Sequence, residues 1–357
     1  MAKILYFGCS AFSATSRFRA EALIRIGHEV VIADPYLIVE KQLKNKWFGA
    51  LHFRTGYKFI SPKIRDWLRD FLSDHRDFDV AWIDSGEVFD YKSLKLLSDA
   101  GLLTLLYNHD DPTGTRDGHR FDTLLKALPF YDFCVGVRKE SIDDYKIHGV
   151  KVAMSVWRSY DEVVHAPYVY ESDIPNSLRS EVAFIGTWMR GERRDIFLLG
   201  LIERGIPVSI WGQRWEKSPI WKKLEKYYRG GNLSGRDYVG AIQGAKVCLG
   251  MLSKGNRDLH TTRSLEIPFA GGILCAERTI EHMQLFEDGV EAVFWSDVDE
   301  CAKLCRRLIE SDAWRESVRL AGSVKIRSLN VGNEDICKKI MNVVIEDVRF
   351  EDKCTLN

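Results

Sequence analysis

The sequence lacks long apolar runs and has no excess of charge of either sign. Its 51 lysines and arginines balance 51 aspartates and glutamates, so no bulk attraction to nucleic acid is expected. No stretch reaches the roughly 18 consecutive apolar residues of a membrane-spanning helix. The apolar run at the N-terminus is too short for a signal peptide. These absences predict a globular, cytoplasmic protein that does not bind nucleic acid.

Cysteine pairs with the spacing of a metal site are also missing. The eight cysteines are scattered, and the i,i+4 pair Cys301 and Cys305 has no histidine partner nearby in the sequence. Several cysteines lie in apolar, strand-like runs, where a thiol behaves as a small hydrophobic side chain. The pattern predicts reduced thiols, and we expect neither a metal centre nor a bound cofactor.

The chain of 357 residues is longer than one typical hydrophobic core and suits two domains. Short apolar runs alternate with longer helical patterns in both halves, which is typical of βαβ units with parallel sheets. We therefore predict an α/β fold of two doubly wound, Rossmann-like domains. The expected strands lie at 4–7, 30–33, 80–83, 103–107, 133–137, 182–185, 208–211, 247–250, 272–275 and 292–295.

Composition suggests where these domains begin and end. A polar, proline-containing segment between His165 and Ser180 predicts a hinge. The segment from Asp335 to Arg349 has apolar residues on one face and predicts an amphipathic helix. We assign 1–168 to a first domain, 169–180 to a linker, 181–330 to a second domain and 331–357 to a C-terminal helix and tail.

The most informative segment runs from Thr261 to Ala276. It predicts a helix that carries Glu266, ends at Gly271 and Gly272, and leads directly into a strand. A carboxylate there can accept two hydrogen bonds from a ribose diol, and glycines let backbone N–H groups approach phosphate oxygens. The segment therefore predicts a nucleotide-sugar site, although a solvated helix that stops at glycine would show the same spacing.

The residues around this segment occur in a familiar order. Arg263, Glu266, the glycine pair, Asp288-Gly289 and Asp297 resemble the donor-binding half of CgeB-like glycosyltransferases, which are close to the family-four retaining enzymes. The resemblance covers nearly all of the second half. It implies the GT-B fold, in which two Rossmann-like domains face a cleft and the C-terminal helix crosses back to the first domain. It also implies transfer of a hexosyl or pentosyl group from a nucleoside diphosphate sugar to a glycan, lipid-linked or other hydroxyl acceptor, without metal and with retention.

The donor's diphosphate needs positive charge and N–H donors, which the first strand end of the second half can supply. Gly186 ends that strand, and Arg190, Arg193 and Arg194 follow it. Ligands bind at the carboxyl ends of strands in such sheets. We expect Arg193 or Arg194, together with Arg263, to hold the phosphates. A solvated basic helix start is the alternative.

The next strand end and the donor loop supply the remaining donor contacts. Trp211 and Gly212 could offer the base a flat wall and backbone groups, although Trp211 could equally be a core residue. In the family-four enzymes a second glutamate, eight residues before the position that matches Glu266, contacts the transferred sugar. Here that position is Asp258, so the sugar contact is expected from this shorter side chain or from the backbone at 260–262.

Three polar residues follow a buried strand of the first half, namely His109, Asp110 and Asp111. His109 resembles the histidine that many retaining GT-B enzymes place beside the donor sugar, and a histidine beside carboxylates is a plausible acid/base group. If transfer inverts, Asp110 or Asp111 is the expected base, with Asp84 or Glu87 as alternatives. A loop that caps the next helix would explain the same residues.

The acceptor is expected to meet the first domain at the polar loop after its first strand, through Ser13, Ser16 and Arg17. This loop lacks the G-x-G-x-x-G pattern, which counts against a Rossmann dehydrogenase. The stretch 41–69 mixes basic and aromatic residues and could contact anionic lipid at the inner face of a membrane. A solvated face with buried aromatics would have a similar composition.

Two other functions stay open. A nucleotide-sugar epimerase on the same fold would convert the donor without an acceptor. A non-catalytic surface or structural protein of the CgeB-like kind would bind no nucleotide.

Overall fold

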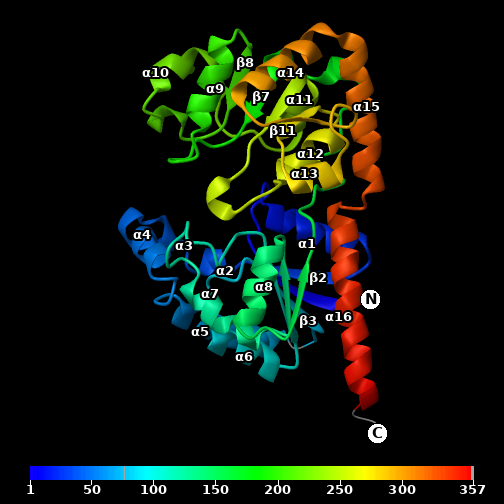
Figure 1. Ribbon diagram of the computed structural model, residues 1–357. Coiled ribbons are helices and arrows are strands. Elements are labelled where there is room, and N and C mark those ends of the chain that lie inside the picture. Colours follow the sequence, from blue (N-terminus) through cyan, green and yellow to red (C-terminus); the bar gives the residue numbers. More distant parts are fainter. Residues whose placement is uncertain (76, 355–357) are drawn as a thin grey trace. The chain divides into compact units, whose positions relative to one another are not determined.

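The computed structural model describes residues 1–75 and 77–354, which form two compact units. One unit consists of residues 1–157 and the chain from Asn333 onward, and the other of residues 158–332. Each is built on a parallel sheet of six strands (Figure 1). The segment 169–180, expected to be a linker, is grouped with the second unit, and residues 355–357 of the expected tail lie outside the described residues.

The first sheet has the order β2-β1-β3-β4-β5-β6. Its central strands are almost entirely buried, as a parallel sheet covered on both faces requires. The strand order reverses between β1 and β3, so the carboxyl ends of these strands flank a switch point where ligands bind in such sheets. The strands are β1 (Lys3–Phe7), β2 (Glu29–Ala33), β3 (Val80–Asp84), β4 (Leu103–Asn108), β5 (Phe133–Gly136) and β6 (Val152–Ser155).

Helices cover both faces of this sheet. The last helix, α16, lies beside α1 (Figure 1), and its Ile336, Ile340 and Val344 share one apolar core with the sheet. The expected return of the C-terminal helix to the first domain is thus confirmed. The helices are α1 (Thr15–Arg25), α2 (Pro35–Ile38), α3 (Glu40–Lys44), α4 (Lys46–Arg54), α5 (Ser61–Asp74), α6 (Tyr91–Asp99), α7 (Asp122–Ala127), α8 (Lys139–Ile147) and α16 (Asn333–Cys354).

The second sheet has the order β12-β11-β10-β7-β8-β9, with its reversal between β7 and β10. Its strands are β7 (Ser180–Ile185), β8 (Val208–Trp211), β9 (Tyr228–Gly230), β10 (Ala245–Gly250), β11 (Leu274–Glu277) and β12 (Val293–Trp295). Its helices are α9 (Arg194–Glu203), α10 (Trp221–Leu224), α11 (Gly235–Gln243), α12 (Thr262–Phe269), α13 (Ile280–Leu285), α14 (Val298–Glu310) and α15 (Asp312–Ser328). The helices α9 and α14 pack together over one core of this unit.

All ten expected strands are present, so the predicted architecture is confirmed. The strand β11 begins at Leu274 rather than at Gly272, because the Gly272 N–H still closes the end of α12 by donating to the Ile267 carbonyl at 2.9 Å. The strands β6 and β9 were not predicted. Each is a short edge strand that is only partly buried, and so lacks a strong apolar run.

Candidate functional site

The helix α12 places a buried carboxylate near the carboxyl edge of the second sheet. Thr261 and Ser264 form a reciprocal capping box that fixes the start of the helix. One turn later, Glu266 accepts a hydrogen bond from the Tyr238 hydroxyl at 2.6 Å. The Nε2 atom of His165 lies 3.7 Å from the other Glu266 oxygen. One oxygen of this carboxylate is therefore held by a neutral donor.

Arg263 lies one turn before Glu266 on the same helix. Its Nε atom is buried without a hydrogen-bond partner, and within the described ranges no carboxylate forms an ion pair with it. Burial raises the pKa of Tyr238 well above its usual value, and the nearby Glu266 charge adds to this increase. The charge of Arg263 opposes it. Among the described residues, the region thus contains a cation without an ion-pair partner, which favours an anionic ligand.

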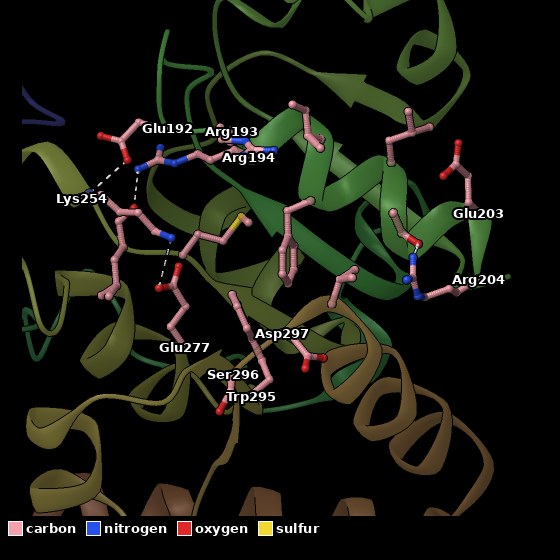
Figure 2. A pocket seen from close by; sticks show the side chains of 17 residues that line it. Glu192, Arg193, Arg194, Glu203, Arg204, Lys254, Glu277, Trp295, Ser296 and Asp297 are labelled. Atoms are coloured by element: carbon pink, nitrogen blue, oxygen red, sulfur yellow. Dashed lines mark hydrogen bonds and ion pairs between the residues drawn. The ribbon is translucent and has the colours of Figure 1, made fainter.

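A second group of expected donor residues lines a pocket of about 500 Å³ between the start of α9 and the ends of β10, β11 and β12 (Figure 2). Arg193 is exposed and has left-handed backbone with φ of 56°. Arg194 donates to the carbonyls of Thr187 at 3.0 Å and Leu252 at 3.1 Å. Arg194 thereby ties the loop after β7 to the loop after β10, whereas Arg193 and the exposed Arg190 keep their charges at the surface.

Acidic side chains share this pocket with the arginines. Glu192 accepts from the Lys254 backbone N–H at 3.0 Å, and the Lys254 ammonium lies 3.7 Å from Glu277 (Figure 2). Burial raises the pKa of Glu277, and Lys254 partly offsets this. Arg263 and Glu266 are not among the residues that line the pocket. Of the arginines expected to hold the phosphates, Arg193 and Arg194 therefore line this pocket and Arg263 does not.

The packing around the glycines of the donor region leaves no room for a larger residue at several of these positions. A Cβ atom on Gly212 would lie 2.1 Å from the Gly186 carbonyl oxygen, and φ of Gly212 is +136°. Gly271 has φ of +86° and ends α12, while a Cβ on Gly272 would lie 2.6 Å from Ile242. Trp211 is only 2% exposed, which is the core environment that the sequence analysis gave as the alternative to a base wall. Contacts of these residues with a nucleotide stay a prediction.

Asp258, the expected sugar contact, lies in a buried ion pair. Its Oδ1 atom is 2.9 Å from Arg158 Nη2, and both side chains are at most 9% exposed. The adjacent loop is held by His260, whose Nε2 accepts from the Arg158 backbone N–H at 3.3 Å and whose Nδ1 lies 2.6 Å from Glu281. Asp258 therefore helps to fix the donor loop, and its contact with sugar stays a prediction.

The switch point of the first sheet contains a cavity of about 350 Å³. It is lined by Ser16 in the first turn of α1, by Asp84 at the end of β3 and by His109 directly after β4. Asp84 accepts from the Tyr6 hydroxyl at 2.6 Å and forms a buried ion pair with Arg19. The Nδ1 atom of His109 lies 3.9 Å from Asp84. The structure thus brings one expected acceptor residue and one expected catalytic residue together with Asp84.

The two aspartates after His109 lie in a loop that Arg120 and Arg138 contact, and their catalytic role stays a prediction. Asp110 forms an ion pair of 3.2 Å with Arg120, which also pairs with Glu87 at 3.1 Å. Arg138 donates to the carbonyl oxygens of His109 at 3.1 Å and Asp110 at 2.7 Å. Asp111 is buried. Neither aspartate lines the cavity described above.

The other two acceptor candidates lie outside this cavity. Ser13 is exposed, and Arg17 forms an i,i+4 ion pair of 2.8 Å with Glu21. The Arg17 guanidinium also lies 5.4 Å from the ring centre of the exposed Phe12. These contacts leave Ser16 as the acceptor candidate with a defined cavity.

The sequence analysis missed a cluster of three buried thiols. Cys275 on β11 and the pair Cys301 and Cys305 on α14 have sulfur atoms within 4.8 Å of one another. Three such sulfurs could ligate a soft metal ion, but they lie in an apolar core, and burial raises the pKa of Cys301. This environment suits neutral thiols. Only the fold could reveal the cluster, because Cys275 is distant in sequence from the other two.

No helix within the described ranges is long and apolar enough to cross a membrane.

Comparisons with known proteins agree with the observed architecture. The sequence model of a family described as glycosyl transferase-like matches residues 193–331. A search of the curated proteins found no match.

Among solved structures, HepE of Anabaena in complex with UDP-glucose has a TM-score of 0.64 and 11% identity, covering 97% of this chain and 100% of that chain. Sucrose-phosphate synthase of Thermosynechococcus elongatus has a TM-score of 0.69 and 11% identity, covering 98% and 100%. A putative UDP-N-acetylglucosamine 2-epimerase of Listeria monocytogenes has a TM-score of 0.55 and 10% identity, covering 95% and 94%.

The fold is GT-B. The part of this GT-B chain that matches the glycosyl transferase-like family includes α12 with Arg263 and Glu266, as well as α9 with Arg194. The first unit lies outside that match. The narrower resemblance to the CgeB-like branch stays a prediction.

Proposed function

We propose that the protein is a glycosyltransferase that takes a hexosyl or pentosyl group from a nucleoside diphosphate sugar. One observation carries the proposal: α12 places Arg263, which has no ion-pair partner among the described residues, one turn from the buried carboxylate of Glu266. Both residues lie within the segment that matches the glycosyl transferase-like family. A diphosphate needs a cation, and a ribose diol needs a hydrogen-bond acceptor. A nucleoside diphosphate carries both groups.

The second oxygen of Glu266, which accepts no hydrogen bond within the described part of the chain, supports a role with the ribose. One carboxylate oxygen accepts from Tyr238, and the other has His165 at 3.7 Å, beyond hydrogen-bonding distance. That second oxygen is proposed to accept from the ribose hydroxyls. Because HepE was solved with UDP-glucose, a uridine nucleotide is the first to test.

The transfer itself is proposed to retain configuration and to require no metal. The bond between the anomeric carbon and the diphosphate oxygen breaks, and a bond from that carbon to the acceptor oxygen forms. The acceptor proton passes to the departing phosphate, so no strong protein base is needed. Asp84 is not needed as a base in this scheme, which agrees with its contacts: Arg19 and the Tyr6 hydroxyl already engage its carboxylate. Arg263 would stabilise the negative charge that grows on the leaving group.

The acceptor is proposed to be a glycan, a lipid-linked sugar or another hydroxyl compound, bound by the first unit. Its cavity at the β1–β3 switch point is lined by the Ser16 hydroxyl and by His109. Both groups can form hydrogen bonds with neutral hydroxyls.

The decisive experiment is a thermal-shift titration of the full chain with UDP, GDP, CDP, dTDP and ADP, in Mg²⁺ and in EDTA. We expect one nucleotide to stabilise the protein equally in both buffers. Glu266→Ala should abolish the shift, and the exposed Glu310→Ala should keep it. A shift that needs Mg²⁺ would overturn metal independence, and no shift with any nucleotide would overturn the donor site.

An epimerase is the second candidate, because a putative epimerase shares the fold and each unit has a histidine near a buried carboxylate. Incubation with UDP-N-acetylglucosamine and no acceptor separates the two functions. Appearance of an epimeric sugar nucleotide would favour the epimerase.

A further inference from the structure

A group of large apolar side chains is exposed on α4 and on the turn after it. Trp47 is 88% exposed and Phe59 is 59% exposed, and between them Phe48, Leu51 and Phe53 are also exposed. We call these five residues the aromatic patch. Exposed single apolar residues are ordinary, but such a concentration within 13 positions marks an interaction surface.

The helix α4 is held in place, so one of its faces stays exposed and the other faces the protein. Asn45 caps it by accepting from the backbone N–H groups of Trp47 at 3.0 Å and Phe48 at 3.2 Å. The opposite side faces the protein, since His52 is buried and a Cβ on Gly49 would lie 2.6 Å from the Leu43 carbonyl oxygen. Trp47, Phe48 and Leu51 therefore share the outward face of the helix.

The turn that carries Phe59 is fixed as well. Gly56 has φ of +60°, and a Cβ there would lie 2.8 Å from the His119 carbonyl oxygen. The Gly56 carbonyl also accepts a hydrogen bond from the Thr123 hydroxyl on α7. The aromatic patch is consequently presented by anchored backbone at both ends.

The segment that carries the patch is rich in basic residues. Between residues 40 and 63 the sequence has six basic residues and a single acidic one, Glu40, although the whole chain is neutral. Glu40 pairs with Lys44 at 2.6 Å. Lys41 and Arg54 are exposed and, in the part of the chain that the structure describes, have no acidic partner. The aromatic patch thus consists of exposed apolar side chains in a segment that carries an excess of positive charge.

We propose that α4 and the aromatic patch dock on the surface of an anionic lipid bilayer. Aromatic side chains enter the interface between headgroups and acyl chains, while lysines and arginines meet the lipid phosphates. A second copy of this chain fits less well, because two such patches would bring like charges together. The inference stands apart from the proposed function, although a lipid-linked acceptor would make it useful.

Co-sedimentation of the full chain with sucrose-loaded vesicles tests this inference. One vesicle contains phosphatidylcholine alone, and the other contains phosphatidylcholine with phosphatidylglycerol. We expect binding to the anionic vesicles that weakens as salt is added. Trp47→Ser with Phe48→Ser should lower the affinity about tenfold or more, because two aromatic side chains leave the interface. Lys58 is exposed, and its ammonium lies 4.9 Å from the ring centre of Phe59. Arg54→Glu with Lys58→Glu should remove the preference for anionic lipid.

Ile147→Ser, an equally exposed apolar position of the same unit, is the matched control and should bind as the wild type does. All variants should keep the wild-type melting temperature and its response to nucleotide, which separates this test from that of the donor site. Equal binding by the patch variants and the wild type, or no binding to anionic vesicles, would overturn the proposal. So would a wild-type dimer in light scattering that the Trp47→Ser/Phe48→Ser variant converts to a monomer.

Discussion

The two units contain similar groups around a buried carboxylate, and they differ in what the nearby arginine does. In the first unit, Asp84 accepts from the Tyr6 hydroxyl at 2.6 Å and has His109 at 3.9 Å. In the second, Glu266 accepts from a tyrosine hydroxyl at 2.6 Å and has a histidine at 3.7 Å. Arg19 pairs with the first carboxylate, whereas Arg263 does not pair with the second.

Under the proposed function, this difference suits the two units to different ligands. A buried ion pair is already neutral and attracts neither an anion nor a cation strongly, so the cavity beside Asp84 suits a neutral hydroxyl compound. The charge of Arg263 is not balanced in the same way, so its surroundings favour a diphosphate. The same residue types thus fit the acceptor role proposed for one unit and the donor role proposed for the other.

The largest expected effect comes from breaking the ion pair of the first unit. Asp84→Asn leaves Arg19 buried without a counter-charge and should lower the free energy of unfolding by about 3–5 kcal/mol. Glu266→Gln, which breaks no such pair, should cost only about 1 kcal/mol. Urea unfolding of the two variants measures both values.

A double variant protects this test against a simple failure to fold. Asp84→Leu with Arg19→Met replaces both charges by apolar groups and should recover most of the stability lost in Asp84→Asn. Equal losses in Asp84→Asn and Glu266→Gln would show that the two carboxylates do not differ as the contacts suggest.

A fall in pH should lower the stability of the second unit through protonation of His282, whose side chain contacts Ser264 on α12. The His282 Nδ1–H donates to the Glu277 carbonyl at 2.6 Å, so its Nε2 accepts from the Ser264 hydroxyl at 2.8 Å. Burial lowers the pKa of His282 from 6.5 to about 4. The unfolded chain therefore takes up this proton first, and the stabilisation that is complete above pH 6.5 is lost as the pH falls toward 4.

The loss over that range should be about 3 kcal/mol for the imidazole of His282. The free energy of unfolding, measured in urea at several pH values, should fall more steeply for the wild type than for His282→Gln. Parallel pH profiles would contradict this prediction.

The sequence predicted the elements well, but not the partners of the charges. Apolar runs and glycines place the strands and α12, because burial and helix ends depend on local residue types. The pairing of Arg19 with Asp84 and of Arg158 with Asp258 depends on contacts between distant segments. For the same reason Asp110 could not be recognised as a partner of Arg120.

Removal of Arg263 should affect the ligand and not the fold. Arg263→Ala is expected to weaken UDP binding about 10- to 100-fold, since a charge-assisted hydrogen bond is worth roughly 1.5–3 kcal/mol. Its free energy of unfolding should change by less than about 0.5 kcal/mol, because no ion pair of Arg263 with another described residue is lost. Calorimetric titration with UDP gives the first value. Arg19→Ala should show the reverse pattern, with a large loss of stability and unchanged UDP affinity.

The smallest effect is expected for Arg17, whose ion pair with Glu21 is exposed. Both side chains are about one-third exposed, and such pairs contribute about 0–1 kcal/mol. Arg17→Ala should therefore leave urea unfolding and UDP affinity almost unchanged. Because the variant should not change stability or UDP affinity, any rise in the KM for an acceptor would indicate a direct contact between Arg17 and the acceptor. A large loss of stability in Arg17→Ala would instead show that charge pairing at this edge of the first unit is structural even where it is solvent-exposed.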